Sequence, residues 1–150
     1  MDLDWNQVKI PADFDANSAA FVEFCKRLKD VGKEVVILGP LPTYSSNRIA
    51  GYARSLRRHE EHNAVLCAHE NFNHNYGRFL SLLEDMERTG LCKAVYPHAV
   101  LSSPKGYPAI NNGIPMFKDA DHLSVQGSIY VMNELKQELK NVLLSESDSE

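Results

Sequence analysis

No apolar run in this sequence approaches the ~20 residues that a membrane-spanning helix needs. The N-terminus, MDLDWNQVK, also lacks the basic start and the apolar segment of a signal peptide. Positive charge is in the minority, since 16 Lys and Arg stand against 20 Asp and Glu and the formal net charge is -4. Such a chain has no basic field to attract a polyanion, so nucleic acid is not expected as a partner. These absences predict a soluble chain that carries no targeting signal of its own.

Cysteine is also scarce. The three cysteines, Cys25, Cys67 and Cys92, form no C-x-x-C pair. Their odd number argues against a disulfide framework, while it leaves a single bridge open. A buried free thiol is the simplest interpretation of Cys25, so the fold is expected to depend on a hydrophobic core.

Length and composition predict one domain. With 150 residues, 43% of them hydrophobic, the chain can bury a core but is too short for two comfortable domains. Residues 1–143 are expected to form this domain. Residues 144–150 end in the acidic run SESDSE and are expected to be a solvated, disordered tail.

The first clear elements are a helix and then a strand. Apolar residues from Asn17 to Val31 recur at helical spacing, and Gly32 follows the last turn. The run EVVILG, residues 34–39, then predicts a short strand that is buried on both faces and central in its sheet. This order predicts an α/β fold, a small parallel sheet flanked by helices. The loop PLPTYSSN would leave the C-terminal edge of the sheet, where open α/β folds place their sites.

The remaining elements are predicted in the order helix, short strand or irregular piece, helix, strand and helix. They cover residues 47–62, 65–69, 75–88, 93–100 with a break at Pro97, and the segment that begins at Ser124. Residues 101–115, rich in Gly, Pro, Ser and Asn, predict a long, functional surface loop. Ser124 is expected to cap the last helix. The buried stripe of that helix is predicted to comprise Ile129, Met132, Leu135, Leu139, Val142 and Leu143.

The densest chemistry lies in KDADHLSVQG, residues 118–127. A histidine acts as a base only if a partner fixes its tautomer, and Asp119 can reach the ring of His122 across one turn of chain. Asp121 is the rival partner, but an immediate neighbour is less suited to curl onto the same ring. The pair predicts half of a catalytic triad. The structural alternative is that the carboxylates cap the last helix and favour its positive N-terminal end.

This stretch resembles the last conserved block of SGNH hydrolases, in which D-x-x-H is followed by L-S and a glycine at the start of a C-terminal helix. The closer likeness is to the SGNH domain at the C-terminus of membrane-bound O-acyltransferases that acylate bacterial surface polysaccharides. FCKRLKDVGKEVVILGPLP resembles the strand and loop of that domain, and the likeness runs from Val22 to Val131. It implies a partial SGNH fold, which is flavodoxin-like, with Asp119 orienting His122 as general base.

The nucleophile block of that family is missing from this sequence. SGNH enzymes carry their serine in a G-D-S block, and neither G-D-S nor G-x-S-x-G occurs here. No G-x-N-D block supplies an oxyanion-stabilising asparagine either; Trp5 and Asn6 are only weak substitutes. Ser45 and Ser46 follow the predicted strand, but turn chemistry accounts for them. The resemblance therefore implies the C-terminal part of an SGNH domain, inactive alone, whose serine lies elsewhere.

The first functional hypothesis is part of an O-acyltransferase or esterase that moves an acyl group to or from a carbohydrate hydroxyl, with no cofactor. Expected partners are the acylated or acceptor carbohydrate, and a membrane acyltransferase domain or the missing N-terminal SGNH segment. The full family protein would place this domain in the periplasm or at the extracytoplasmic face of the membrane. The alternative is a non-catalytic SGNH-like module that binds glycan or protein. A G-D-S block upstream in the same reading frame would favour the enzyme.

A second polar cluster, HEEHNAVLCAHENFNH, contains four of the six histidines. Its possible ligands are His59, His62, Cys67, His69 and His74. Their spacing fits no zinc signature and their neighbours are typical of a solvated helix face, so no metal site is predicted. Arg54, Arg57 and Arg58 form a small basic patch, usually a solvated face, which could meet an anionic glycan.

Overall fold

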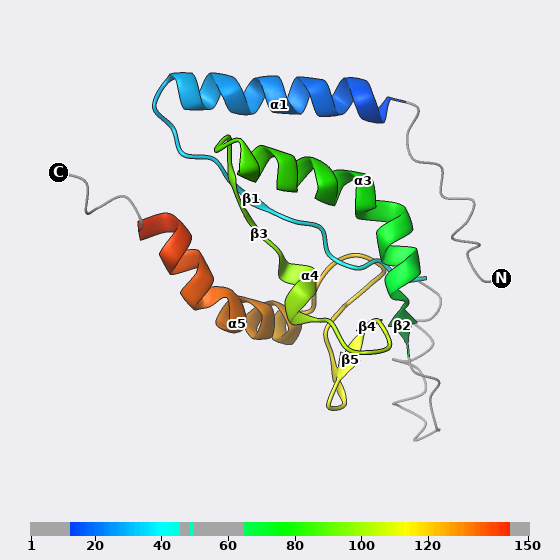
Figure 1. Ribbon diagram of the computed structural model, residues 1–150. Coiled ribbons are helices and arrows are strands. Elements are labelled where there is room, and N and C mark those ends of the chain that lie inside the picture. Colours follow the sequence, from blue (N-terminus) through cyan, green and yellow to red (C-terminus); the bar gives the residue numbers. More distant parts are fainter. Residues whose placement is uncertain (1–12, 46–48, 50–64, 145–150) are drawn as a thin grey trace.

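The computed structural model describes residues 13–45, 49 and 65–144 (Figure 1). Its helices are α1 (Phe14–Asp30), α3 (His69–Arg88), α4 (Pro97–Val100) and α5 (Val125–Leu144). The strands are β1 (Val36–Leu38), β2 (Leu66–Cys67), β3 (Lys93–Val95), β4 (Tyr107–Pro108), β5 (Ile110–Asn111) and β6 (Ile114–Pro115). The predicted α/β class is confirmed. Apart from Ile49, the helix predicted over 47–62 and its arginine patch lie outside the described residues.

β1 and β3 form the small parallel sheet that the sequence predicts. Their register pairs Ile37 with Ala94, and the N–H of Gly39 continues the ladder by donating to the Val95 carbonyl at 2.8 Å. Figure 1 shows this pair between α1 and α3 on one side and α5 on the other. The prediction of a central strand is wrong, since β1 has β3 as its one strand neighbour within the described ranges. The predicted burial is only partial, because Val36 and Ile37 are half-buried and Leu38 is 56% exposed.

Successive residues of β1 contact two different cores. Val36 packs against the larger core, whose fully buried side chains include Phe72, Val95 and Phe117, and Ile37 packs against a smaller one. This alternation is the normal consequence of the two-residue period of a strand. The run EVVILG therefore contacts one core with each face of the strand.

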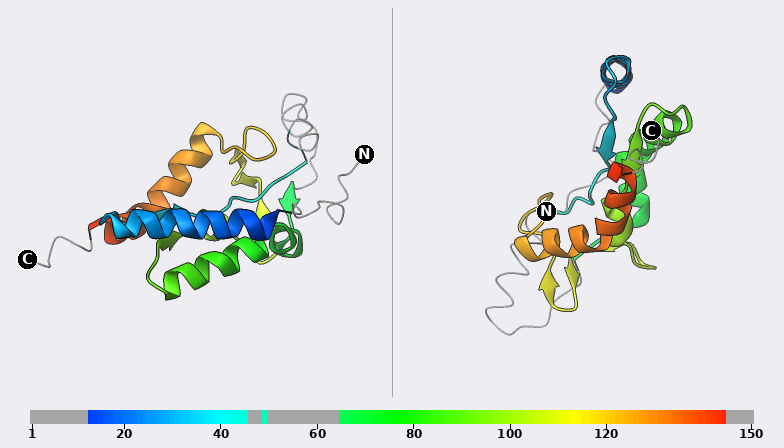
Figure 2. Two further views of the ribbon diagram at one scale, coloured as in Figure 1. Left: turned by 90° about the horizontal axis from the view of Figure 1, so that it is seen from above. Right: turned by 90° about the vertical axis from the view of Figure 1, so that its left-hand side faces the viewer.

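The smaller core lies where α1 covers the sheet. Cys25 and Cys92 are buried in it and are free thiols, as is Cys67 in the larger core, so the interpretation of Cys25 is confirmed. α1 and α3 lie side by side (Figure 2), and the rings of Phe21 and Phe79 join them with centroids 6.4 Å apart. Burial raises the pKa of the Cys25 thiol, because it penalises the thiolate.

α3 begins at His69, earlier than the predicted start at Asn75. The residue before it, Ala68, has extended dihedral angles and provides no side-chain cap, so the local sequence carries no start signal there. The first turn instead buries Phe72, which is 1% exposed and stacks near Tyr107 at a centroid distance of 4.7 Å. Tertiary packing thus extends the helix by pairing residues that are distant in sequence.

The predicted surface loop 101–115 contributes to the core, and this prediction is wrong in its central part. Pro97 ends the strand before it and starts α4, as a proline at the first helical position does. Further on, Ala109 is 1% exposed. β5 and β6 then form a hairpin whose two turn residues, Asn112 and Gly113, have φ of 49° and 78°. Two positive φ values in an Asn-Gly pair are typical of a type I′ turn.

α5 is capped as predicted but buries a different face. The Oγ of Ser124 accepts a hydrogen bond from the N–H of Gly127 at 2.9 Å. The buried residues are Gly127, Val131 and Leu135, with Leu139 and Val142 partly buried. The predicted stripe is therefore right for three of its members and wrong for the exposed Ile129, Met132 and Leu143. Neither α5 nor any other helix in the described part of the chain is long and apolar enough to cross a membrane.

The glycine at the start of α5 explains this change of face. A Cβ at Gly127 would lie 2.0 Å from the carbonyl oxygen of Met116, so the helix backbone rests directly on that residue. The same carbonyl accepts the N–H of Ser124 at 2.8 Å. Because a periodicity count follows apolar side chains, it does not register a contact made by a glycine backbone.

Candidate active site

The predicted acid and base lie in a closed turn just before α5. An isolated bridge between Phe117 and Leu123 closes the turn, and the N–H of Lys118 donates to the carbonyl of His122 at 3.0 Å. Residues 119–122 therefore form a compact loop whose two ends are held together by these backbone contacts. α5 follows immediately, so a rigid element anchors it.

The loop that leaves β1 reaches the same turn. The N–H of Tyr44 donates to the carbonyl of Ala120 at 2.7 Å. This contact confirms that the loop after Gly39 and the loop before His122 meet at one edge of the sheet. The C-terminal end of a parallel strand thus delivers backbone to the candidate site, as open α/β folds do.

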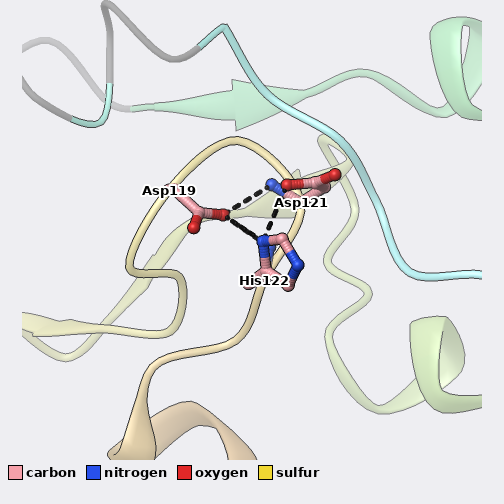
Figure 3. A network of polar contacts seen from close by, with 3 residues as sticks. All are labelled: Asp119, Asp121 and His122. Carbon is pink, nitrogen blue, oxygen red and sulfur yellow. Dashed lines mark hydrogen bonds and ion pairs between the residues drawn. The ribbon is translucent and has the colours of Figure 1, made fainter.

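Asp119 and His122 contact each other as the sequence predicts (Figure 3). The distance from His122 Nδ1 to Asp119 Oδ1 is 2.9 Å. The same oxygen accepts the backbone N–H of His122 at 2.8 Å and that of Asp121 at 3.2 Å. One carboxylate oxygen thus receives three hydrogen bonds, which fixes both the turn and the imidazole.

Asp121 also approaches the ring. Its Oδ1 lies 3.0 Å from His122 Nδ1 in an ion-pair contact, whereas the contact of Asp119 has hydrogen-bond geometry. Two carboxylates around Nδ1 favour the tautomer with the proton on that nitrogen. Nε2 is then the basic nitrogen, and it has no hydrogen-bond partner among the described residues.

The hydrogen bonds of Asp119 determine its electrostatics. Partial desolvation raises the pKa of Asp119, but the N–H groups of His122 and Asp121 and the ring of His122 outweigh it and lower the pKa to about 2. Asp119 is consequently a carboxylate at neutral pH. A stable negative charge beside Nδ1 is what a histidine base requires.

We expect the Asp119 carboxyl to titrate near pH 2 rather than near its ordinary value of 3.8. A depressed pKa means that this group stabilises the fold fully above the unfolded value, and that the stabilisation disappears as the pH falls towards about 2. Carboxyl carbon shifts followed by NMR against pH measure it directly. In His122→Ala the pKa should rise but stay below 3.8, because the two backbone donors remain. Titration of wild-type Asp119 at 3.8 or above would contradict the geometry.

The carboxylates make no capping hydrogen bond to α5 in the described structure. Ser124 fills the cap position of α5, since its Oγ accepts the Gly127 N–H and donates to the Pro115 carbonyl at 2.6 Å. The bonds of Asp119 run within its own turn instead. Asp119 therefore does not act as the hydrogen-bonding cap of α5.

The structure describes one of the two serines that the sequence offers as nucleophiles. Ser45 is buried at 6% exposure and Ser46 lies outside the described residues. Among residues 13–45, 49 and 65–144, the side chain of His122 makes its polar contacts with carboxylates alone. The side chains of His122 and Asp119 are 64% and 45% exposed, so Nε2 faces outward.

The histidine cluster is split between different surroundings. His69 Nε2 contacts the Ser103 carbonyl at 2.9 Å, His74 is exposed, and His59 and His62 lie outside the described residues. Within the described ranges, ligand atoms close enough to share a cation come from Asp119, Asp121 and His122, which lie within 4.8 Å of one another. These three already satisfy each other through Nδ1, and exposed acidic groups are common without an ion.

Comparisons with known proteins address the same region. A family model described as "SGNH domain (fused to AT3 domains)" matches residues 2–137. A solved periplasmic domain of a lipopolysaccharide acetyltransferase from Salmonella ser. Paratyphi A superposes with a TM-score of 0.59 and 15% identity, over 81% of this chain and 48% of that one. The chain thus spans about half the length of that domain, and the likeness shows a shared fold. A search of curated proteins gives no significant match.

Proposed function

This chain belongs to the SGNH domains that are fused to AT3 domains, and from that membership we propose that it supplies the acid–base half of a Ser-His-Asp triad for acyl transfer. The observation that carries the proposal is the bond between Asp119 Oδ1 and His122 Nδ1 at 2.9 Å, with Nε2 open to the outside. Asp119 orients the ring and stabilises the imidazolium, and His122 is the general base.

The chemistry follows from the free nitrogen. Nε2 takes the proton of a serine hydroxyl while the serine oxygen attacks the carbonyl carbon of an acyl ester. The protonated His122 then gives this proton to the departing oxygen, which leaves an acyl-serine. Nε2 next takes the proton of a carbohydrate hydroxyl, and the oxygen of that hydroxyl attacks the acyl carbon. The bond from this carbon to the serine oxygen breaks, and His122 returns the proton to the serine. Water in place of the carbohydrate gives hydrolysis. No cofactor is needed for either step.

The serine is proposed to come from an SGNH segment outside these residues. Two observations support this: no G-D-S block occurs in the sequence, and the chain spans about half of the Salmonella domain. Within the described ranges β1 pairs with β3 alone, so its other edge is where such a segment would add its strands. The AT3 membrane domain is the proposed further partner, and the extracytoplasmic side of a membrane the proposed location.

The alternative is a non-catalytic SGNH-like module that binds glycan or protein. One observation supports this alternative: among the described residues no serine contacts the outward-facing Nε2 of His122. In that case His122→Ala would change glycan binding by the chain, whereas a completed SGNH domain would show no esterase activity.

We expect the isolated chain to hydrolyse p-nitrophenyl acetate no faster than the same concentration of free imidazole. Histidine and aspartate without the serine lose most of the rate that a triad gives, since its members act as a unit. The assay compares the chain with its His122→Ala variant. Robust turnover that depends on His122 would show that a serine of this chain is the nucleophile and would end the proposal of an external one.

A further inference from the structure

A buried residue from another segment, Tyr44, contacts the turn that carries Asp119 and His122. Its N–H donates to the carbonyl of Ala120, the residue between the two carboxylates, at 2.7 Å. Figure 3 shows the cyan loop after β1 passing beside the turn. This is a backbone bond to the turn itself, so a displacement of Tyr44 shifts Asp119 and His122 together.

The ring of Tyr44 contacts the residue pair that closes the same turn. It meets the ring of Phe117 edge-on, with centroids 4.7 Å apart and planes inclined by 61°. Phe117 is 1% exposed and forms the bridge to Leu123 that closes the turn. Such an edge-to-face pair prefers one geometry, so the ring restrains both the place and the direction of the closing bridge.

The hydroxyl of Tyr44 makes a third contact, which anchors the residue in the core. It donates to the carbonyl of Tyr107 in β4 at 3.1 Å, and the residue as a whole is 4% exposed. Burial, with Cys67 and Tyr107 nearby, raises the pKa of Tyr44, so the hydroxyl remains a donor. β4 pairs with β2, and the anchor therefore belongs to the larger core rather than to the loop.

We propose that Tyr44 is a positioning residue for the Asp119–His122 pair, an inference that rests on the proposed function. Its hydroxyl donates to the Tyr107 carbonyl in the larger core, its ring packs against Phe117, and its N–H donates to the Ala120 carbonyl. Through these three contacts Tyr44 restrains the conformation of the turn. The three donors to the Asp119 carboxylate all belong to this turn, so they stay in place only while the turn keeps that conformation.

Tyr44→Phe tests this, because it removes the hydroxyl and leaves the ring and the backbone donor. The amide of Tyr44 itself reports on the bond to Ala120, and its hydrogen exchange should become roughly fivefold faster once the anchor is lost. The pKa of Asp119, measured by NMR titration of the 150-residue chain, should rise from about 2 towards 3.8.

Tyr96→Phe is the matched control. It also removes a hydrogen-bonded hydroxyl, which donates to Glu87 at 2.8 Å away from the turn. This variant should lose comparable stability in urea and leave the titration of Asp119 and the exchange of the Tyr44 amide unchanged. Equal effects of the two variants on Asp119 would mean a general loss of stability and would overturn the inference.

The failure of this inference can be distinguished from the failure of the proposed function. If the wild-type chain shows a depressed pKa for Asp119 and Tyr44→Phe leaves both readouts unchanged, Tyr44 is no positioning residue although the pair stands. If the wild-type pKa of Asp119 is not depressed, the pair itself is absent and both proposals fall.

Discussion

Replacing His122 with alanine is expected to lower kcat/KM for acyl-ester turnover by about 10⁴-fold or more in a protein that joins this chain to an SGNH segment carrying G-D-S. The reason is that Nε2 of His122 is the proposed base for the serine proton, since Nδ1 is committed to Asp119 and Asp121. Steady-state kinetics on p-nitrophenyl acetate and on an acylated carbohydrate measure the loss. A His122→Ala enzyme with more than a tenth of wild-type activity would remove His122 from the mechanism.

Two aspartate variants provide the internal control. Asp119→Asn should cost about 10³-fold, because the amide cannot balance the imidazolium and favours the wrong tautomer. Asp121→Asn should cost at most about fivefold, since an exposed ion pair contributes about 1 kcal/mol or less. The structure gives both carboxylates access to Nδ1, at 2.9 and 3.0 Å. A larger loss in Asp121→Asn than in Asp119→Asn would transfer the orienting role to Asp121.

The second large effect is expected at Gly127. In Gly127→Ala the new methyl group would lie 2.0 Å from the Met116 carbonyl oxygen, and backbone cannot give way as a flexible side chain can. Forcing α5 away from Met116 should lower the free energy of unfolding by about 3 kcal/mol or more. It should also loosen the turn, because the Met116 carbonyl holds the N–H of Ser124. Urea unfolding of the 150-residue chain measures the stability change.

Gly77→Ala is the control for this change. Gly77 lies inside α3, and a Cβ built there meets nothing within 4 Å. Alanine is the better helix former, so this variant should be unchanged or more stable by up to about 1 kcal/mol. If both alanine variants unfold at the same urea concentration, the close approach of α5 to Met116 is not a feature of the folded chain.

Local signals in the sequence predicted the elements that depend on neighbouring residues. The helical spacing from Asn17 to Val31 predicted most of α1, which begins earlier, at Phe14, and ends at Asp30, and the run EVVILG contains β1. The cap at Ser124 and the contact of Asp119 with His122 also arise within a few residues, so spacing and chemistry were sufficient to find them. The fold class followed from their order.

Contacts between distant residues account for the differences. Phe72 starts α3 early because it packs among rings from later segments, and Gly127 turns α5 because Met116 lies beneath it. Tyr44 joins Tyr107 across 63 residues, and no spacing rule could pair the two. The hairpin at Asn112 and Gly113 is different, because an Asn-Gly pair is a known signal for a hairpin turn. The surrounding Gly, Pro, Ser and Asn residues led to the prediction of a loop instead.

The central claim is that this chain provides the base for a serine that lies outside it. Labelling with a fluorophosphonate, which reacts with activated serines, followed by mass spectrometry of the labelled peptides, tests that claim most directly. The SGNH segment carrying G-D-S and this chain are treated separately, together, and together with His122→Ala. The account predicts label on the G-D-S serine only when wild-type chain is present. Label on a serine of this chain, or labelling of the segment that is indifferent to His122, would contradict it.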